Sequence, residues 1–146
     1  MLAADSPAFL RALLGATNGH DLDALVACFD PAYRNDAPAH PGRAFEGTEQ
    51  VRSNWAQIFS FVPDAQARVM RWAADGSEVW SEWEMSGTRI DGTRHLMRGV
   101  IIFGVSDDRA TSARFYLEPV DDTTTAGVDN AVAQQVHAHT ATSRPT

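Results

Sequence analysis

Two polar residues at alternate positions, Tyr33 and Asn35, are the first candidates for chemistry in this chain. They fall in the short alternating stretch 32–37, and a strand there would turn both side chains toward one face. A phenol and an amide on one face can orient a carbonyl group or a water molecule by hydrogen bonds. The alternative is that they satisfy ordinary buried hydrogen bonds. Arg34 and Asp36 would point to the other face, as a solvated or interface ion pair.

Two histidines are the candidates for proton transfer, because imidazole titrates near neutral pH. His95 lies near the tip of a predicted hairpin, where it is either a base at the rim of a pocket or a half-exposed strand residue. His40 lies between prolines in the loop 38–42, where it either contacts a ligand or has no role.

The segment 79–105 predicts two long strands that fold back on each other, and their register decides which side chains face a cavity. A two-residue turn would place Arg98 in an apolar row, opposite Met85. A three-residue turn, with Gly92 left-handed and forming a bulge, keeps that row almost wholly apolar, and we expect this register. The inward pairs are then Val79/Phe103, Ser81/Ile101, Trp83/Gly99, Met85/Met97 and Gly87/His95.

This register has consequences for both faces of the hairpin. Glu82 and Glu84, the most tempting catalytic carboxylates, point away from the core, and Glu84 lies opposite Arg98. Large apolar side chains on the inward face and on a neighbouring helix either wall a pocket for a ring-shaped apolar ligand or form plain core. These candidate ligand-binding residues are Trp55, Trp83, Met85, Met97 and Phe115.

The outward face carries an apolar row beside charged residues, made of Trp80, Val100 and Ile102. An exposed row of this kind indicates a homodimer surface. Coverage by the C-terminal segment is the alternative.

Helical spacing predicts three helices before the long strands. The first begins after Ser6 as its cap, and the second is short, capped by Asp21 and ended by Pro31. The third begins at 47–49 and ends at Pro63. Its core-facing positions follow the pattern i, i+4, i+7, i+8 and are Val51, Trp55, Ile58 and Phe59.

Two more strands flank the central hairpin. The strand 65–74 has two alternative inward sets, Met70 with Trp72 or Val69 with Arg71, because the following turn has either two or three residues. The strand 110–120 follows a tight turn that we expect to be a three-residue loop with Asp108 left-handed. That loop keeps Ala113, Phe115 and Leu117 inward and turns Arg114, Tyr116 and Glu118 outward. Three helices beside a curved antiparallel sheet predict an α+β fold.

Length and composition limit the function classes. The 146 residues suit one domain over 1–120, followed by an extension over 121–146 with a short helix at 129–139 and a frayed tail. A net charge of −7 without a basic cluster argues against nucleic acid and anionic membranes as partners. No apolar run is long enough to span a bilayer and no signal segment is recognisable, so we expect a soluble, cytoplasmic protein.

Metal and cofactor chemistry find no support in the sequence. Cys28 is the single cysteine, so it forms no internal disulfide or cysteine-based zinc site and is expected to be a small buried hydrophobe. His137 and His139 lack a nearby third ligand. No glycine-rich phosphate loop or nucleophile elbow occurs, and we expect no cofactor.

The element order and several short motifs resemble the SnoaL-like polyketide cyclase family, within the nuclear transport factor 2-like superfamily. The resemblance covers about residues 10–120, and its motifs are Tyr33-x-Asn35, the Pro/Gly loop, the 47–59 helix, Trp83-x-Met85-x-Gly87-Thr88 and Phe115-Tyr116-Leu117-Glu118. It implies a cone-shaped, curved antiparallel sheet with three helices on its concave face, an apolar pocket, and a dimer through the outer sheet face. Family members include cyclases, a ketosteroid isomerase, dehydratases and limonene epoxide hydrolase.

Carried over by position, Tyr33 and Asn35 match the pair that holds the attacking water in the epoxide hydrolase. The arginine and the two aspartates of that enzyme fall on Trp83, Met85 and Phe115, which cannot activate water. The base of the isomerase falls near Asn35, and Asp36 would replace it only if the strand carried a bulge.

Three hypotheses follow from these residues. The first is a cofactor-independent cyclase, isomerase or hydratase acting on an apolar oxygenated substrate, with Tyr33 and Asn35 polarising a carbonyl or holding water. In this hypothesis His95 or His40 moves the proton. The second is a non-catalytic protein that holds a lipophilic ligand in the same pocket. The third, a scaffold acting through dimerisation, leaves Tyr33 and Asn35 without a purpose.

Overall fold

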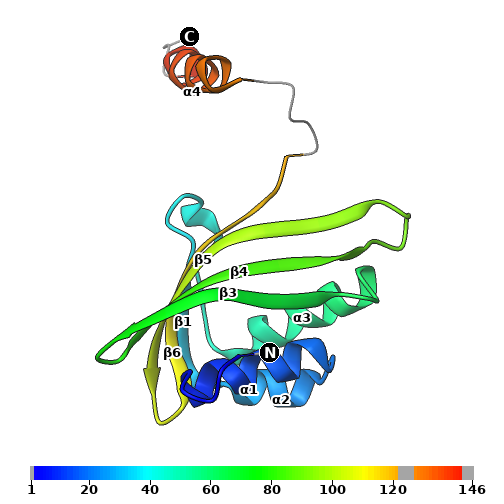
Figure 1. Cartoon of the computed structure of the whole chain (residues 1–146), viewed down its shortest axis with the longest axis vertical. Helices are drawn as coiled ribbons and strands as arrows, with labels where there is room; N and C mark the ends of the chain where they lie inside the picture. The colour runs from blue at the N-terminus through cyan, green and yellow to red at the C-terminus, as the bar shows by residue number, and fades with distance from the viewer. Residues whose placement is uncertain (1, 122–126, 143–146) are drawn as a thin grey trace.

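A six-stranded sheet in the order β2-β1-β6-β5-β4-β3 forms the body of the protein. The computed structural model describes residues 2–121 and 127–142. Helices α1, α2 and α3 gather on one side of the curved sheet, so the predicted α+β fold is confirmed (Figure 1). The sheet is not wholly antiparallel as predicted, because β1 pairs with β6 in parallel. The elements are α1 Ala8–Asn18, α2 Leu22–Ala27, β1 Phe29–Asp36, η1 Pro41–Arg43, β2 Phe45–Glu46, α3 Thr48–Phe61, β3 Gln66–Asp75, β4 Glu78–Thr88, β5 Arg94–Ser106, β6 Arg109–Pro119 and α4 Val128–Thr142.

The β4–β5 hairpin has the predicted register. Trp83 pairs with Gly99, Met85 with Met97 and Gly87 with His95. Gly92 is left-handed, with φ of 86°, as a three-residue turn with a bulge requires. The inward row is therefore apolar, and the glutamates of β4 lie on the outer face.

Glu84 shows how the outer face accommodates its charges. Its carboxylate accepts hydrogen bonds from Arg68 and Arg98, both at 2.8 Å. These bonds, with Arg98 contributing most, lower the pKa of Glu84 below its usual value. The residue is thus an ionised member of a surface network and has no access to the concave side.

The β5–β6 turn differs from the predicted loop in length, although the inward set is correct. Ser106 pairs with Arg109, so the loop has two residues, and both Asp107 and Asp108 are left-handed with φ of 53° and 58°. A two-residue turn alone would shift the register by one residue. A bulge at Thr111 restores it, because pairing passes from Val105↔Ala110 to Gly104↔Ser112, and the side chains of Ala113, Phe115 and Leu117 still face inward.

A second bulge resolves the open question about β3. Val69 pairs with Trp83 and Arg71 with Glu82, which leaves Met70 as the extra residue. Val69 and Trp72 therefore both face inward, so each predicted set is half right. Met70 is 51 % exposed on the outer side.

The first two helices start differently from each other. The predicted Ser6 cap is wrong, because its hydroxyl donates to the carbonyl of Ala3 at 2.7 Å and makes no cap hydrogen bond to α1. The Asp21 cap is confirmed, because its carboxylate accepts from the backbone N–H of Ala24 at 3.0 Å. The strand β1 begins at Phe29, before the proline that we expected to end α2, and Cys28 between them is buried as predicted.

The C-terminal helix α4 is longer than the predicted 129–139 segment and is described over Val128–Thr142. The predicted frayed tail at 143–146 lies outside the described residues. The division into a 1–120 domain and an extension stays a prediction.

Trp83 lies in the core and pairs with Gly99 of β5. The indole of Trp83 is 3 % exposed, and its N–H donates to the Ser81 hydroxyl at 2.7 Å, which in turn donates to the carbonyl of Ile101 at 2.8 Å. Gly99 has φ of 152°, and a Cβ there would overlap the carbonyl oxygen of Tyr116 on β6. Close pairing of β5 with β6 thus depends on the missing side chain.

The variant Gly99→Ala is expected to lower the free energy of unfolding by about 3 kcal/mol or more, because rigid backbone and not a flexible side chain opposes the added methyl group. Gly15→Ala is the control, since a Cβ at Gly15 meets nothing and alanine favours a helix. Urea unfolding followed by tryptophan fluorescence measures both. Equal stability of the two variants would contradict the close β5–β6 approach.

Candidate functional site

A cavity of about 610 Å³ lies between α3, the sheet and the loop that follows β1. We call it the pocket. Its walls are mainly apolar, and its polar side chains come from β1, α3, β5, β6 and the loop 37–44. The lining residues are Phe29, Tyr33, Asn35, Ala37, His40, Gly42, Arg43, Ala44, Phe45, Gln50, Val51, Asn54, Trp55, Ile58, Met85, His95, Met97, Phe115, Leu117 and Glu118.

Tyr33 and Asn35 form a hydrogen-bonded pair in the pocket wall. The Tyr33 hydroxyl donates to Asn35 Oδ1 at 2.7 Å, and the two residues are 1 % and 9 % exposed. The Tyr33 ring packs edge-on against Phe29 and Phe45. Burial, and secondly the charge of Asp36, raises the pKa of the Tyr33 hydroxyl far above its usual value. Tyr33 therefore keeps its proton and serves as a hydrogen-bond donor.

The amide nitrogen of Asn35 is the hydrogen-bond donor of this pair that remains unused. Its Oδ1 is used by Tyr33, whereas no hydrogen bond from Nδ2 to another described residue is formed. Among the described residues, every fully buried side-chain nitrogen or oxygen has a hydrogen-bond partner. Nδ2 has no such partner, so it must be partly accessible at the surface of the protein or of the pocket. Because Asn35 lines the pocket, its N–H groups can donate to an oxygen atom there.

His95 brings an imidazole to the same pocket from β5, opposite Gly87 of β4. Burial, with a smaller contribution from the charge of Arg89, lowers the pKa of His95 below its usual value. The ring is therefore neutral at neutral pH and offers a lone pair on one nitrogen, as a general base requires.

His40 and Glu118 meet at the pocket from distant parts of the chain. The Nε2 atom of His40 lies 2.7 Å from Oε1 of Glu118, and both side chains are partly exposed. The last β1–β6 pair joins Asp36 to Arg114, and β6 continues beyond it to Pro119. The segment that carries Glu118 thus extends past the end of β1, where the loop 37–44 meets it.

Sequence interpretation missed Glu118, because strand alternation assigns it to the outer face opposite Arg98. It also missed Gln50 and Asn54 of α3, since attention to apolar spacing ignores polar positions on the same helix face, and it missed Arg43 of the loop 37–44. One signal was present, because Glu118 ends the last motif that carries the family resemblance.

Four of the five predicted ligand-binding residues line the pocket, namely Trp55, Met85, Met97 and Phe115. Trp83 does not, since its ring is buried deeper in the core beside Ser81. A residue on the correct face of a strand can still lie behind others, which strand alternation cannot show.

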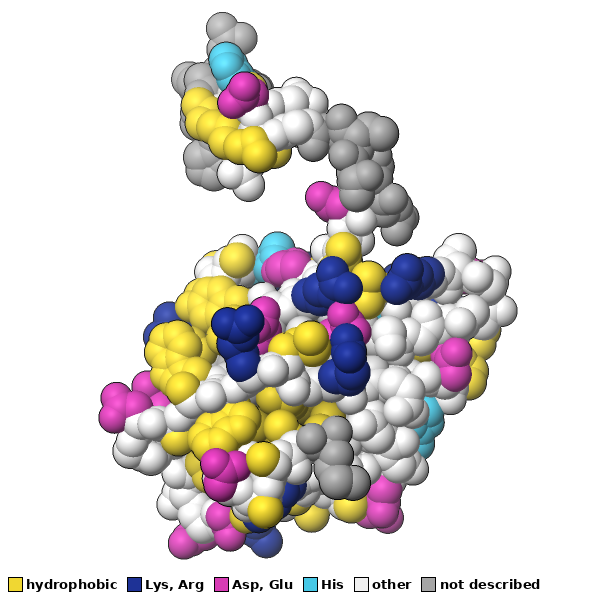
Figure 2. Space-filling view, in the orientation of Figure 1, with side chains coloured by type: hydrophobic (Ala, Val, Ile, Leu, Met, Phe, Trp, Pro, Cys, Tyr) yellow, Lys and Arg dark blue, Asp and Glu magenta, His cyan; other side chains and the backbone are white. Residues whose placement is uncertain are grey.

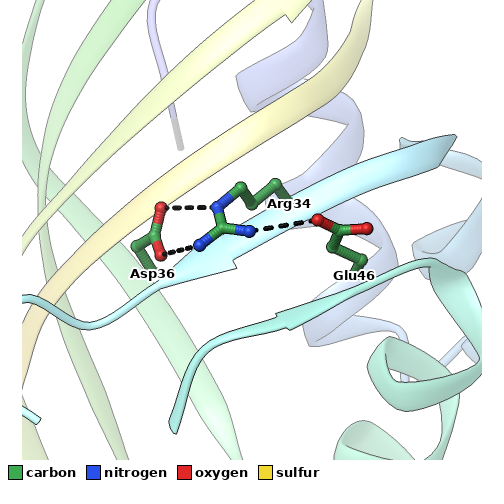
Figure 3. Close-up of polar contacts among 3 residues, drawn as sticks. All are labelled: Arg34, Asp36 and Glu46. Carbon is green, nitrogen blue, oxygen red and sulfur yellow. Dashed lines mark hydrogen bonds and ion pairs between the residues drawn. The ribbon is translucent and has the colours of Figure 1, made fainter. Parts of the chain in front are cut away.

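Asp36 lies on the outer side of β1, where Figure 3 shows it bound to the guanidinium of Arg34. The same guanidinium donates to Glu46 of β2 at 3.0 Å. Asp36 is therefore outside the pocket, and the β1 bulge that would bring it inward as a base does not occur at this position.

Three further features of the described residues bear on function. Within the described part of the chain, no three side chains of His, Cys, Asp or Glu come together as a metal site. The thiol of Cys28 is buried, which raises its pKa, and it donates to the carbonyl of Ala24. Across residues 2–121 and 127–142, no helix has both the length and the apolar character needed to cross a membrane.

Several solved structures share this fold. An LEH-like epoxide hydrolase from M. tuberculosis is 21 % identical, with a TM-score of 0.67 over 90 % of this chain and 95 % of its own. A ketosteroid isomerase-like fold protein from Catenulispora acidiphila, in complex with trimethylamine, is 17 % identical, with a TM-score of 0.66 over 88 % and 92 %. A candidate polyketide cyclase from Sinorhizobium meliloti is 19 % identical, with a TM-score of 0.63 over 81 % and 100 %. These likenesses show the fold.

The curved sheet with its three helices is an α+β fold of the nuclear transport factor 2-like class. The model of the SnoaL-like domain matches residues 10–113, and the chain belongs to that family. A search of curated protein sequences finds no match.

The lowered pKa of His95 predicts how the free energy of unfolding changes with pH. The unfolded chain takes up this proton near pH 6.5, the usual value, whereas the folded chain takes it up only at lower pH. Acidification from about pH 7 to pH 5 therefore favours the unfolded state, and stability falls as pH decreases through that window. His95→Gln should flatten this part of the curve, as measured by urea unfolding at each pH.

The matched control is His137→Gln, which removes an exposed imidazole from α4. It should leave the pH dependence as in the unmodified protein. If the free energy of unfolding depends on pH in the same way for His95→Gln and for the unmodified protein over this range, the burial of the His95 imidazole is refuted.

Proposed function

We propose that the protein binds an apolar, oxygenated ring compound in the pocket and acts on it as a cofactor-independent cyclase, isomerase or hydratase. One observation carries the proposal. A buried donor pair, Tyr33 and Asn35, opens into an apolar cavity whose wall also holds the neutral imidazole of His95. The SnoaL-like family and its cyclase-like and hydrolase-like neighbours support the same class of reaction.

The donor pair suits the stabilisation of a developing negative charge on oxygen. A ligand carbonyl would accept a hydrogen bond from Asn35 Nδ2. The Tyr33 hydroxyl, by donating to Asn35 Oδ1, polarises the amide and strengthens its N–H donors. The surroundings are apolar and the pair is already oriented, so this stabilisation needs little reorganisation during the reaction.

The imidazole of His95 would remove the proton. It takes a proton from the carbon next to the carbonyl, and the electron pair of that C–H bond moves to the oxygen, which forms an enolate. If a double bond is conjugated with the enolate, return of the proton from His95 to the far carbon of that system gives an isomer. Attack of the enolate carbon on a second carbonyl instead closes a ring, and the proton on His95 goes to the alkoxide that forms. In a hydratase, the same groups would hold a water molecule.

Non-catalytic binding of a lipophilic ligand is the second candidate. The observation that favours it is the absence, among the described residues, of a carboxylate that reaches both the pocket and the Tyr33–Asn35 pair: Asp36 lies outside, and Glu118 is bound to His40. In that case the polar pair would only orient the ligand.

Deuterium exchange separates the two candidates, with 2-tetralone, a bicyclic ketone, as the probe. The protein should accelerate exchange of the hydrogens next to the carbonyl in D2O, as followed by proton NMR. Asn35→Ala and His95→Gln should each lower the rate by about 100-fold, since they remove the oxygen donor and the base. Tyr33→Phe should lower it by about 10-fold, because it only weakens the donor.

Asn130→Ala and His137→Gln are the matched controls, because both residues lie exposed on α4. Both variants should accelerate hydrogen exchange in the probe as much as the unmodified protein does. Binding of the probe without exchange supports the second candidate. If the exchange rate is the same in all five variants, Tyr33, Asn35 and His95 do not have the catalytic roles proposed here.

We also propose that the outer sheet face forms a homodimer interface. Trp80 is 47 % exposed there, and Val100, which pairs with Glu82, is partly buried. Ile102 pairs with Trp80 but is only 9 % exposed, so the predicted exposed row is reduced at that position. Figure 2 shows hydrophobic side chains beside arginines on one face of the molecule. Such a mixture of an aromatic anchor, aliphatic residues and arginines is typical of protein interfaces.

Trp80→Glu should convert the dimer to a monomer, because it places a charge in the centre of the interface. Light scattering coupled to gel filtration measures the mass. Ile90→Glu is the control, since Ile90 is 65 % exposed at the β4–β5 hairpin tip, away from the outer row. A monomeric unmodified protein, or a dimer unaffected by Trp80→Glu, would contradict the interface.

A further inference from the structure

Among the described residues that line the pocket, His40 and Glu118 are the one pair of ionisable side chains in direct contact. It joins side chains that are 78 positions apart, one on the loop 37–44 and one near the end of β6. Both residues line the pocket with which the donor pair Tyr33–Asn35 is in contact. The position of the pair is therefore a property of the folded pocket and not of local sequence.

Glu118 binds His40 and not the arginine opposite it. Arg98 lies directly opposite Glu118 in the β5–β6 register. The Nε atom of Arg98, however, donates to Glu84 at 2.8 Å, and no ion pair between Arg98 and Glu118 is formed among the described residues. The contact of the Glu118 carboxylate is with the histidine of the loop.

A carboxylate contact has a defined effect on an imidazole. An ionised carboxylate only accepts hydrogen bonds, so the Nε2 atom of His40 must carry the hydrogen that lies between the two groups. The neutral ring then has its lone pair on Nδ1. No hydrogen bond to Nδ1 is formed by the described residues. His40 therefore has an acceptor atom that no described residue uses, on a side chain that lines the pocket.

We propose that Glu118 is a positioning residue that holds His40 in its Nε2–H form, and that the Nδ1 atom of His40 accepts a hydrogen bond from a hydroxyl group of the ligand. This inference rests on the proposed function and narrows its substrate class. The ligand is an apolar ring compound with a carbonyl oxygen that binds Asn35 and a hydroxyl group that binds His40. A site built for a hydroxyl group discriminates against analogues that cannot donate.

The tautomer of His40 is tested without any ligand. Long-range nitrogen–proton NMR of the labelled full-length protein distinguishes the two neutral forms of each histidine. In the unmodified protein, neutral His40 should be almost wholly Nε2–H. In Glu118→Gln both forms should be populated, because a glutamine amide can accept from Nε2–H or donate to an unprotonated Nε2.

Glu118→Asp, which keeps the carboxylate, should restore the Nε2–H form. Glu46→Gln is the matched control, because Glu46 is an exposed carboxylate that binds Arg34 outside the pocket. It should leave His40 unchanged. A neutral His40 that carries its proton on Nδ1 in the unmodified protein, or one that Glu118→Gln leaves unaltered, overturns the positioning role.

The ligand class is tested with a matched pair of ketones, 6-hydroxy-1-tetralone and 6-methoxy-1-tetralone, by calorimetry. The unmodified protein should bind the hydroxy ketone about 10-fold more tightly, since only that ketone can donate to Nδ1. Glu118→Gln should lose this preference while binding the methoxy ketone as before. If Glu118 only held the loop in place, Glu118→Gln would instead lower the affinity for both ketones by the same factor.

The outcomes separate this inference from the proposed function. Equal affinity of the two ketones for the unmodified protein refutes the hydroxyl assignment and leaves the pocket function standing. Failure of both ketones to bind refutes the pocket function together with the hydroxyl assignment. The NMR result decides the role of Glu118 in either case.

Discussion

The pairing of β4 with β5 is the constraint on which the rest of the structure depends. In a strand, side chains alternate between faces, so a shift of one residue would exchange the pocket wall with the outer surface. The left-handed Gly92 in the turn and the missing side chain at Gly99 hold the observed register. Met85 and Met97 consequently face the helices, and the glutamates of β4 face outward.

Charge and apolar surface are separated by the same register. Glu84 is bound by Arg68 and Arg98 on the outer face, where the ion pairs of this sheet remain in contact with water. Pairs of this kind contribute little to stability, but they hold the Glu84 carboxylate outside the pocket. Arg43 and Glu118 do line the pocket, but the Tyr33–Asn35 hydrogen bond is more deeply buried than either. The apolar walls around this buried pair favour uncharged oxygenated groups over ionic ones there.

Two carboxylates lie opposite Arg98, and it binds one of them. Glu84 on β4 and Glu118 on β6 both pair with Arg98 in register, and the guanidinium donates to Glu84. Glu118 instead contacts His40 on the loop 37–44. Glu118 thus lines the pocket, whereas Glu84 stays on the outer face.

Much of this architecture could be predicted from residue patterns, and the failures have identifiable causes. The hairpin register followed from one glycine and an apolar row, because the alternative register would have placed Arg98 in the core. The bulges at Met70 and Thr111 could not be predicted, since an extra residue changes the register without leaving a mark in the alternation.

The candidate site was partly accessible in the same way. Tyr33 and Asn35 were recognisable from their spacing within one strand, but Glu118 was not, because its contact comes from a loop beyond the end of β1. Trp83 lies on the correct face and yet outside the pocket, since depth within a core depends on packing among several elements. Tertiary contacts of these kinds are absent from a one-dimensional pattern.

The most direct test of the account is the affinity for Nile red, a neutral oxygenated ring compound, in two methionine variants. Met97→Trp should fill the pocket and lower the affinity by at least about 10-fold, because the added ring occupies the ligand volume. Met70→Trp, the same change at an exposed position of β3, should bind as the unmodified protein does. Equal affinities of the two variants would contradict the account, because they would show that the inward face of the β4–β5 hairpin does not form the ligand site.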